Sequence, residues 1–124
     1  MIEEDYVSYD VAKLLKEKGF DERTIYHYII GQPTSLQHNI VYNKYCNSDA
    51  ENIYVSPTHQ MAMKWLREVY NIFIEIIIFR ENMVHYRFKI LNRDCEKIYI
   101  DDGSQFSYEE AVEAALKYSL ESLI

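Results

Sequence analysis

The chain has 124 residues, of which 48% are hydrophobic and 15% aromatic, and its formal net charge at pH 7 is -7. This length suits one domain with one core, and the composition excludes an intrinsically disordered chain. No apolar run approaches the roughly 20 residues of a membrane span, and the acidic start lacks the features of a secretory signal. We therefore expect a cytoplasmic protein in which Cys46 and Cys95 are free thiols.

The N-terminal half begins with a helix signal. Residues 8–20 predict a helix with Ser8 as N-cap, closed by Gly19 in the left-handed region and a hydrophobic contact of Phe20. Strand-forming residues at 24–30 predict a strand that could add a fourth strand to the sheet described below. The polar stretch 34–55, with the scattered tyrosines Tyr42, Tyr45 and Tyr54, predicts a long loop with one short element at most.

A second helix is predicted over residues 56–70. Ser56 is its expected N-cap, and Pro57 suits the first helical position because proline lacks a backbone N–H. Five residues have the spacing of one apolar stripe: Met61, Ala62, Trp65, Leu66 and Val69.

A third helix is predicted over residues 107–124. Ser107 and Glu110 have the spacing of a capping box, in which the serine and the glutamate each accept a hydrogen bond from a free backbone N–H. The expected buried side of the helix consists of Ala111, Ala114, Ala115, Tyr118 and Leu123.

Three strands are predicted between the second and third helices. Residues 71–79, 84–90 and 96–101 alternate in the period of two that is typical of strands, and short turns separate them. The fold class is therefore α+β, a three- to four-stranded antiparallel sheet with α-β-β-β-α order in residues 57–123 and an extra N-terminal helix. We expect a single domain, 1–124, with residues 1–56 packed on the 57–124 unit.

The register of the first hairpin follows from its turn. A loop of Arg80, Glu81 and Asn82, with Asn82 in the left-handed region, places Phe79 opposite Met83. The apolar pairs Ile78–Val84, Ile76–Tyr86, Ile74–Phe88 and Ile72–Ile90 then share the core face, and Glu75 lies opposite Arg87 on the other. Across the second turn, at Arg93, Asp94 and Cys95, the same pattern pairs Ile90 with Ile98.

The reverse face of the first strand is also apolar. If its large side chains were exposed to water, each would lose about 2 kcal/mol of hydrophobic stabilisation. We therefore expect residues 1–56, a second copy of the chain, or a host or phage protein to pack on this face. Aromatic and arginine residues suit such a contact surface. The candidate interface residues are Phe73, Ile77, Phe79, His85, Arg87 and Tyr99.

Two segments resemble a family of small bacteriophage- and prophage-encoded proteins. The first segment is Ser56, Pro57 and Thr58 followed by Lys64 to Glu68, and the second is Tyr108 to Ala111. The resemblance covers about two thirds of the chain and implies a phage origin. It implies no activity and no catalytic residue.

The order α-β-β-β-α is also that of double-stranded-RNA-binding domains. Those domains place lysine at the start of the last helix, near the phosphates. Here the corresponding residues are Tyr108, Glu109 and Glu110, and the two carboxylates would repel phosphate. RNA binding through this surface is therefore disfavoured.

The residues offer little for catalysis. No metal-ligand spacing joins the four histidines, and His59 is expected on the surface in the first turn of its helix. Cys95 has no evident base beside it, and Asp101 and Asp102 suit a turn. We expect no cofactor, no metal site and no small-molecule ligand.

The sequence thus predicts a non-catalytic accessory protein that acts through protein–protein binding, without a membrane. The alternative is a regulatory factor associated with nucleic acid, which would use the basic residues of the hairpins. These residues are Arg80, Arg87, Lys89, Arg93 and Lys97.

Overall fold

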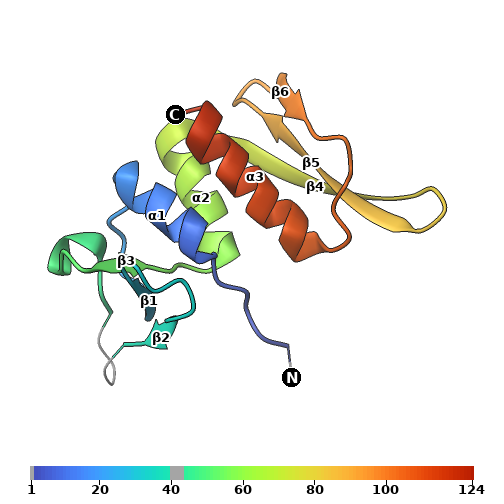
Figure 1. Cartoon of the computed structure of the whole chain (residues 1–124). Helices are drawn as coiled ribbons and strands as arrows, with labels where there is room; N and C mark the ends of the chain where they lie inside the picture. The colour runs from blue at the N-terminus through green and yellow to red at the C-terminus, as the bar shows by residue number, and fades with distance from the viewer. Residues whose placement is uncertain (1, 40–43) are drawn as a thin grey trace. The chain divides into compact units, whose positions relative to one another are not determined.

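The structure, a computed structural model, describes residues 2–39 and 44–124 and forms two compact units, Met1–Met61 and Ala62–Ile124 (Figure 1). The described residues contain three α-helices and two three-stranded antiparallel sheets, which confirms the α+β class. Each unit contains one of the sheets. The packing of residues 1–56 on the rest of the chain stays a prediction, and Tyr42 lies outside the described residues.

The first unit opens with helix α1, Tyr9–Glu17, as predicted. The Ser8 side chain accepts a hydrogen bond from the Val11 backbone N–H at 3.3 Å. At the other end, Gly19 has φ +92°, and the Phe20 N–H donates to the Leu15 carbonyl at 2.9 Å. Both signals act within one helical turn, which is why the sequence alone predicts them.

The remaining elements of this unit are β1 (Tyr26–Ile29), β2 (Gln37–His38), the 3-10 turn η1 (Asn47–Asp49) and β3 (Ile53–Val55). The strand at 24–30 therefore exists, but the prediction that it could join the other sheet is wrong. It is the central strand of the sheet β2-β1-β3, in which Tyr28 lies opposite Tyr54. Residues 34–55, expected as a loop, supply both of its neighbours, so they hold more structure than the one short element expected.

The start of α2, His59–Tyr70, also differs from the expectation. Thr58 caps the helix, since its hydroxyl accepts from the Met61 N–H at 3.1 Å. Ser56 is instead buried, and its hydroxyl donates to the Val7 carbonyl at 2.9 Å. Because the segment before Val7 pairs with residues 57–59, His59 is buried and not on the surface as expected.

The buried side chain of Asn47 links two segments of the first unit by hydrogen bonds. Its side-chain amide donates to the Phe20 carbonyl at 2.7 Å and accepts from the Val55 N–H at 3.0 Å. The end of α1 and the end of β3 are therefore both fixed to the η1 turn.

Asn47→Ala is expected to lower the free energy of unfolding by about 2–4 kcal/mol, because it leaves two buried backbone groups without partners. Asn52→Ala is the control, since Asn52 is exposed. Urea denaturation measures both. If Asn47→Ala lowered the free energy of unfolding by less than about 1 kcal/mol, the proposed role of these two hydrogen bonds would be contradicted.

The η1 turn also depends on a carboxylate. The backbone N–H of Cys46 donates to Asp49 Oδ2 at 2.9 Å, and this bond lowers the pKa of Asp49 below its ordinary 3.8, with Arg23 adding to the effect. A lowered folded-state pKa stabilises the fold above pH 3.8, and the contribution disappears as the pH falls through the folded value.

Asp49→Asn should therefore reduce stability at neutral pH, and its difference from the unsubstituted chain should shrink below about pH 4. Urea midpoints measured from pH 7 to pH 3 test this. Glu51→Gln, an equal charge change at an exposed neighbour, is the control. A difference that stays constant over this range would contradict the prediction.

Helix α2 buries Ala62, Trp65 and Leu66, as predicted, but Met61 and Val69 are 41% and 53% exposed. The apolar stripe is therefore narrower than expected. The helix ends at Asn71, which has φ +56°, and the Ile72 N–H donates to the Leu66 carbonyl at 3.1 Å. This ending uses asparagine where glycine is more common.

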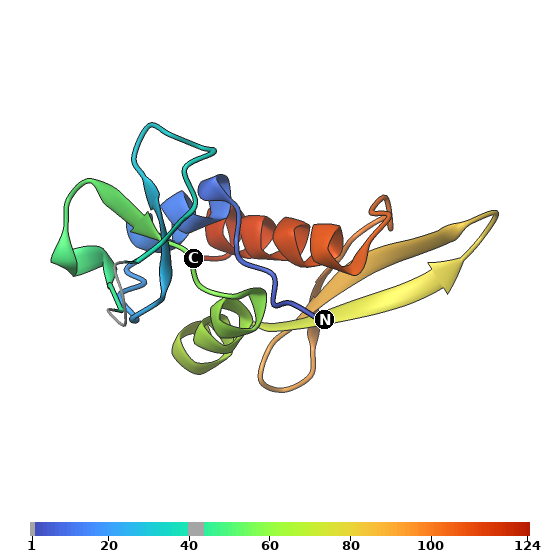
Figure 2. The same ribbon diagram turned by 90° about the horizontal axis from the view of Figure 1, so that it is seen from below.

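The second sheet consists of β4 (Phe73–Arg80), β5 (Val84–Leu91) and β6 (Lys97–Ile100), followed by α3 (Tyr108–Ser122). The predicted order α-β-β-β-α is confirmed. Helix α3 packs on one face, where the Tyr118 ring contacts Phe88 and stacks on Tyr99 with centroids 4.0 Å apart. The β4–β5 hairpin runs past the N-terminal end of α3 in both views (Figures 1 and 2).

The cap of α3 is confirmed in part. The Ser107 hydroxyl accepts from the Glu110 N–H at 3.1 Å, but the Glu110 carboxylate accepts from the Phe106 N–H and not from that of Ser107. Ala111 and Ala115 are buried as expected. Ala114, Tyr118 and Leu123 are half-buried, and Val112, Leu116 and Leu120 take the buried side.

The predicted register of the first hairpin is wrong by two residues. Arg80 lies opposite Val84, Ile76 opposite Phe88 and Glu75 opposite Lys89. The loop is residues 81–83, and Asn82 is not in the left-handed region. A slip of two residues leaves every side chain on its expected face, so hydrophobic alternation cannot detect it.

The second hairpin differs as well. Ile90 lies opposite Tyr99 and not Ile98, and the register shifts between Ile90 and Leu91. The left-handed residue of this turn is Cys95, with φ +63°. As a result Tyr99 lies on the α3 face, whereas Ile98 and Ile100, expected in the core, are exposed.

Candidate protein interface on the outer sheet face

The face of the β4-β5-β6 sheet opposite α3 is called the outer face here. Cross-strand pairs place Phe73 with Leu91, Ile77 with Arg87, and Phe79 with His85 on this face. Glu75 and Lys89 form a pair of opposite charges on it, and Ile100 lies next to Lys89 on β6. The outer face is therefore apolar with a few charges among the apolar groups.

A row of aromatic rings crosses the outer face near the hairpin tip. The His85 imidazole lies between Phe79, with centroids 5.5 Å apart, and Phe106, at 5.2 Å. Gln105 forms an isolated β-bridge with Tyr86 of β5, on the same side of β5 as β6. This bridge places the next residue, Phe106, beside the row. Phe106 is 61% exposed, so the row ends at an open aromatic side chain.

Arg87 lies on the same row. Its guanidinium carbon is 4.2 Å from the centroid of the Phe79 ring, within the range of a cation–π interaction. Arg87 Nε and His85 Nδ1 are buried and have no hydrogen-bond partner within the described chain. Two unsatisfied nitrogens therefore lie two residues apart on one strand and face the same side.

The segment 101–106 covers part of the outer face. Asp101 Oδ2 accepts from the Gly103 N–H at 3.0 Å, and Asp102 Oδ1 accepts from the Ser104 N–H at 3.2 Å, so both carboxylates hold a turn, as predicted. Gly103, with φ +85°, lies directly against the Phe79 ring. This turn covers one side of the Phe79 ring and lies near Arg87.

The structure brings five of the six predicted interface residues together on the outer face. The exception is Tyr99, which lies on the opposite face, as described above. Phe106 was not predicted, because residues 101–106 have no alternating pattern. The only sequence signal for it is a large aromatic residue directly before the Ser107 cap.

The five basic residues of the hairpins are dispersed. Arg80 lies at the tip of the first hairpin, whereas Arg93 and Lys97 lie at the opposite end of β5. Only Arg87 and Lys89 are neighbours on the outer face. The structure thus offers two adjacent cations there, with Glu75 opposite Lys89.

The histidines and cysteines are distributed among structural roles. His27 Nδ1 lies 2.7 Å from Asn39 Oδ1, and His38 Nδ1 lies 2.8 Å from the Asn39 carbonyl. Cys46 is buried, Cys95 is exposed, and both are free thiols. Across residues 2–39 and 44–124, no three acidic, histidine or cysteine side chains are grouped so that they could hold a metal ion.

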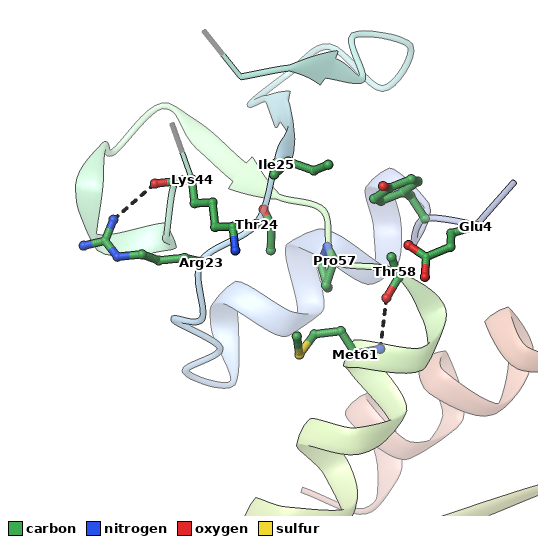
Figure 3. A pocket seen from close by; sticks show the side chains of 9 residues that line it. Glu4, Arg23, Thr24, Ile25, Lys44, Pro57, Thr58 and Met61 are labelled. Atoms are coloured by element: carbon green, nitrogen blue, oxygen red, sulfur yellow. Dashed lines mark hydrogen bonds between the residues drawn. The ribbon is translucent and has the colours of Figure 1, made fainter. Parts of the chain in front are cut away.

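A pocket of about 160 Å³ lies in the first unit (Figure 3). Arg23 and Lys44 line one side, with Glu4 and Thr58 on another. Two of its polar side chains already have structural partners, since Arg23 donates to the Lys44 carbonyl and Thr58 caps α2. Burial raises the pKa of the adjoining Tyr6 hydroxyl, with Tyr26 and Glu4 adding to the effect.

Comparisons with known proteins give no relative: no family model, no curated protein and no solved structure matches the chain. Among the described residues, no helix has the length and apolarity needed to cross a membrane. The outer face is therefore interpreted from its own geometry.

Gly103→Ala tests the contact of the turn with the outer face. An added Cβ would lie 2.6 Å from Phe79 Cε1, so the turn or the ring must move, which adds about 1–3 kcal/mol to the cost of the left-handed backbone. Gly31→Ala is a matched control, because Gly31 has φ +87° and open space around it. Thermal unfolding should show a larger decrease in stability for Gly103→Ala than for Gly31→Ala. Equal decreases would contradict the contact between the turn and Phe79.

Proposed function

We propose that this chain is a small accessory protein of phage or prophage type that acts by binding another protein, without catalysis. The contact surface is the outer face, centred on Phe79, His85 and Arg87. The resemblance of the Ser56–Glu68 and Tyr108–Ala111 segments to phage-encoded proteins supports the origin. The composition of the outer face supports the mode of action.

The observation that carries this proposal is the pair of unsatisfied nitrogens, Arg87 Nε and His85 Nδ1. A buried polar group without a partner costs about 1–3 kcal/mol. A partner that moves the groups covering these nitrogens and brings hydrogen-bonding groups to them would recover that cost. Arginine and large aromatic residues also supply most of the binding energy in protein interfaces, and here they are adjacent.

A protein suits this surface better than a nucleic acid. Counterion release requires several cations in reach of one phosphate backbone, and only Arg87 and Lys89 are neighbours on the outer face. Glu75 lies beside Lys89, and the whole chain carries a net charge of -7. An extended protein segment can use the apolar side chains of Phe73 and Ile77 as well.

Arg87→Met is the sharpest test, because methionine keeps much of the apolar stem and removes the guanidinium that lies over Phe79. Arg93→Met is a matched control in the exposed turn between β5 and β6. Both variants should fold, as circular dichroism can check. In affinity capture from an infected or lysogenic host, the unsubstituted chain and Arg93→Met should enrich the same protein. The amount captured by Arg87→Met should be at least about tenfold lower.

Two results would contradict the proposal. One is equal capture by Arg87→Met and Arg93→Met, which would place the contact elsewhere. The other is capture of no protein by the unsubstituted chain from either host state. Binding of the purified chain to heparin or DNA at about 50 mM salt would favour the nucleic-acid alternative instead.

A further inference from the structure

Strand β4 is the longest edge strand of the molecule's described residues. It spans eight residues, about 26 Å, and the order β4-β5-β6 leaves one of its sides without a neighbouring strand. Its register with β5 is continuous from Phe73 to Arg80. Among the described residues, no backbone hydrogen bond joins that free side to another segment.

This edge lacks the features that usually prevent strand pairing. Natural proteins protect sheet edges with short strands, bulges, proline or lysine. The other edge of the same sheet, β6, has four residues, a register shift at its pairing with β5, and Lys97. The edge strands of the first sheet have two and three residues. In contrast, β4 has no proline, glycine, lysine or bulge.

We propose that β4 pairs antiparallel with β4 of a second copy of this chain, with Ile76 on the two-fold axis. Antiparallel pairing of two identical strands requires an axis perpendicular to the sheet, so both α3 helices lie on the same side. The two sheets then form one continuous sheet. The ladder hydrogen bonds that β4 lacks on its free side come from the second copy.

The side chains of β4 are complementary to themselves in this register. Phe73 lies opposite Phe79 of the second copy, Ile74 opposite Ile78, and Ile76 opposite its equivalent. Glu75 lies opposite Ile77, so no like charges meet. Ile78, which is 62% exposed in one copy, gains an apolar neighbour.

Charge and register both favour a second copy as the occupant. Residues 73–80 carry one acid, Glu75, and one base, Arg80, so two copies can approach at this strand although the chain carries -7. A register centred on Ile77 is poorer, because it replaces the Phe73–Phe79 and Ile74–Ile78 pairs with Phe79 opposite Glu75 and Ile74 opposite Arg80. The pairing uses the edge of the sheet and not the outer face, so it stands independently of the proposed function.

Two substitutions at one position test the pairing. Ile77→Glu places a carboxylate opposite Glu75 of the other copy, in each of two symmetric pairs. This repulsion should weaken the dimer at least about tenfold. Ile77→Lys places an ammonium group there and should retain the dimer. Within one copy, Ile77 lies opposite Arg87, so the glutamate variant is the one favoured in the folded monomer. Circular dichroism of both variants separates loss of the dimer from unfolding.

Size-exclusion chromatography with light scattering over a concentration series gives the result. The unsubstituted chain and Ile77→Lys should reach twice the mass of 14.9 kDa, and Ile77→Glu should stay at the monomer mass. Amide hydrogen exchange of the unsubstituted chain is a second measurement. Exchange in β4 should slow as the concentration rises, and exchange in β6 should not.

Three results would overturn the inference. A monomer mass for the unsubstituted chain at its highest soluble concentration removes the dimer. A dimer that persists equally in both variants moves the contact away from β4. Dissociation of both folded variants indicates that Ile77 meets itself or that the outer faces pack together, and either contradicts the Ile76 register. None of these results depends on the capture of a foreign protein.

Discussion

Strand β4 carries apolar side chains on both of its faces, and helix α3 packs against one face only. Tyr118 of α3 joins Phe88 and Tyr99 on that face. On the other face, the turn at Gly103 lies against the Phe79 ring. Apolar surface that stays in water costs about 25 cal/mol per Å², so this asymmetry favours association of the second unit with another polypeptide. The proposed binding surface is a consequence of this asymmetry.

The outer face combines attraction with selectivity. Its apolar residues favour burial, whereas Arg87 Nε needs a hydrogen-bond acceptor and His85 Nδ1 needs a hydrogen-bond partner. A partner that is only apolar would leave both nitrogens unsatisfied, and a partner with suitably placed polar groups would not. The edge of β4 has a different chemistry, because there the unpaired groups belong to the backbone. The same hairpin can therefore take part in two contacts without competition for the same atoms.

The sequence predicted those features that depend on neighbouring residues. The Ser8 and Ser107 caps, the Gly19 ending and the alternation of the strands each involve a few consecutive positions. The strand register could not be predicted in this way, because a shift of two residues preserves the faces. The turn residue was also predicted wrongly. Asn82 tolerates the left-handed region, yet the non-glycine residues that adopt it are Asn71 and Cys95. Strand propensity also identified β1 without identifying its partners, which come from residues 34–55.

The most direct test of the central claim is whether the apolar outer face is open in an isolated chain and closed in a complex. Methyl NMR with a soluble paramagnetic probe measures this at Ile77 and Ile100, with the fully buried Ile90 as the reference. The account predicts strong relaxation of Ile77 and Ile100 in the dilute chain, and loss of that relaxation when a captured partner is added. Ile77 and Ile100 methyl groups as protected as Ile90 in the dilute monomer would contradict it.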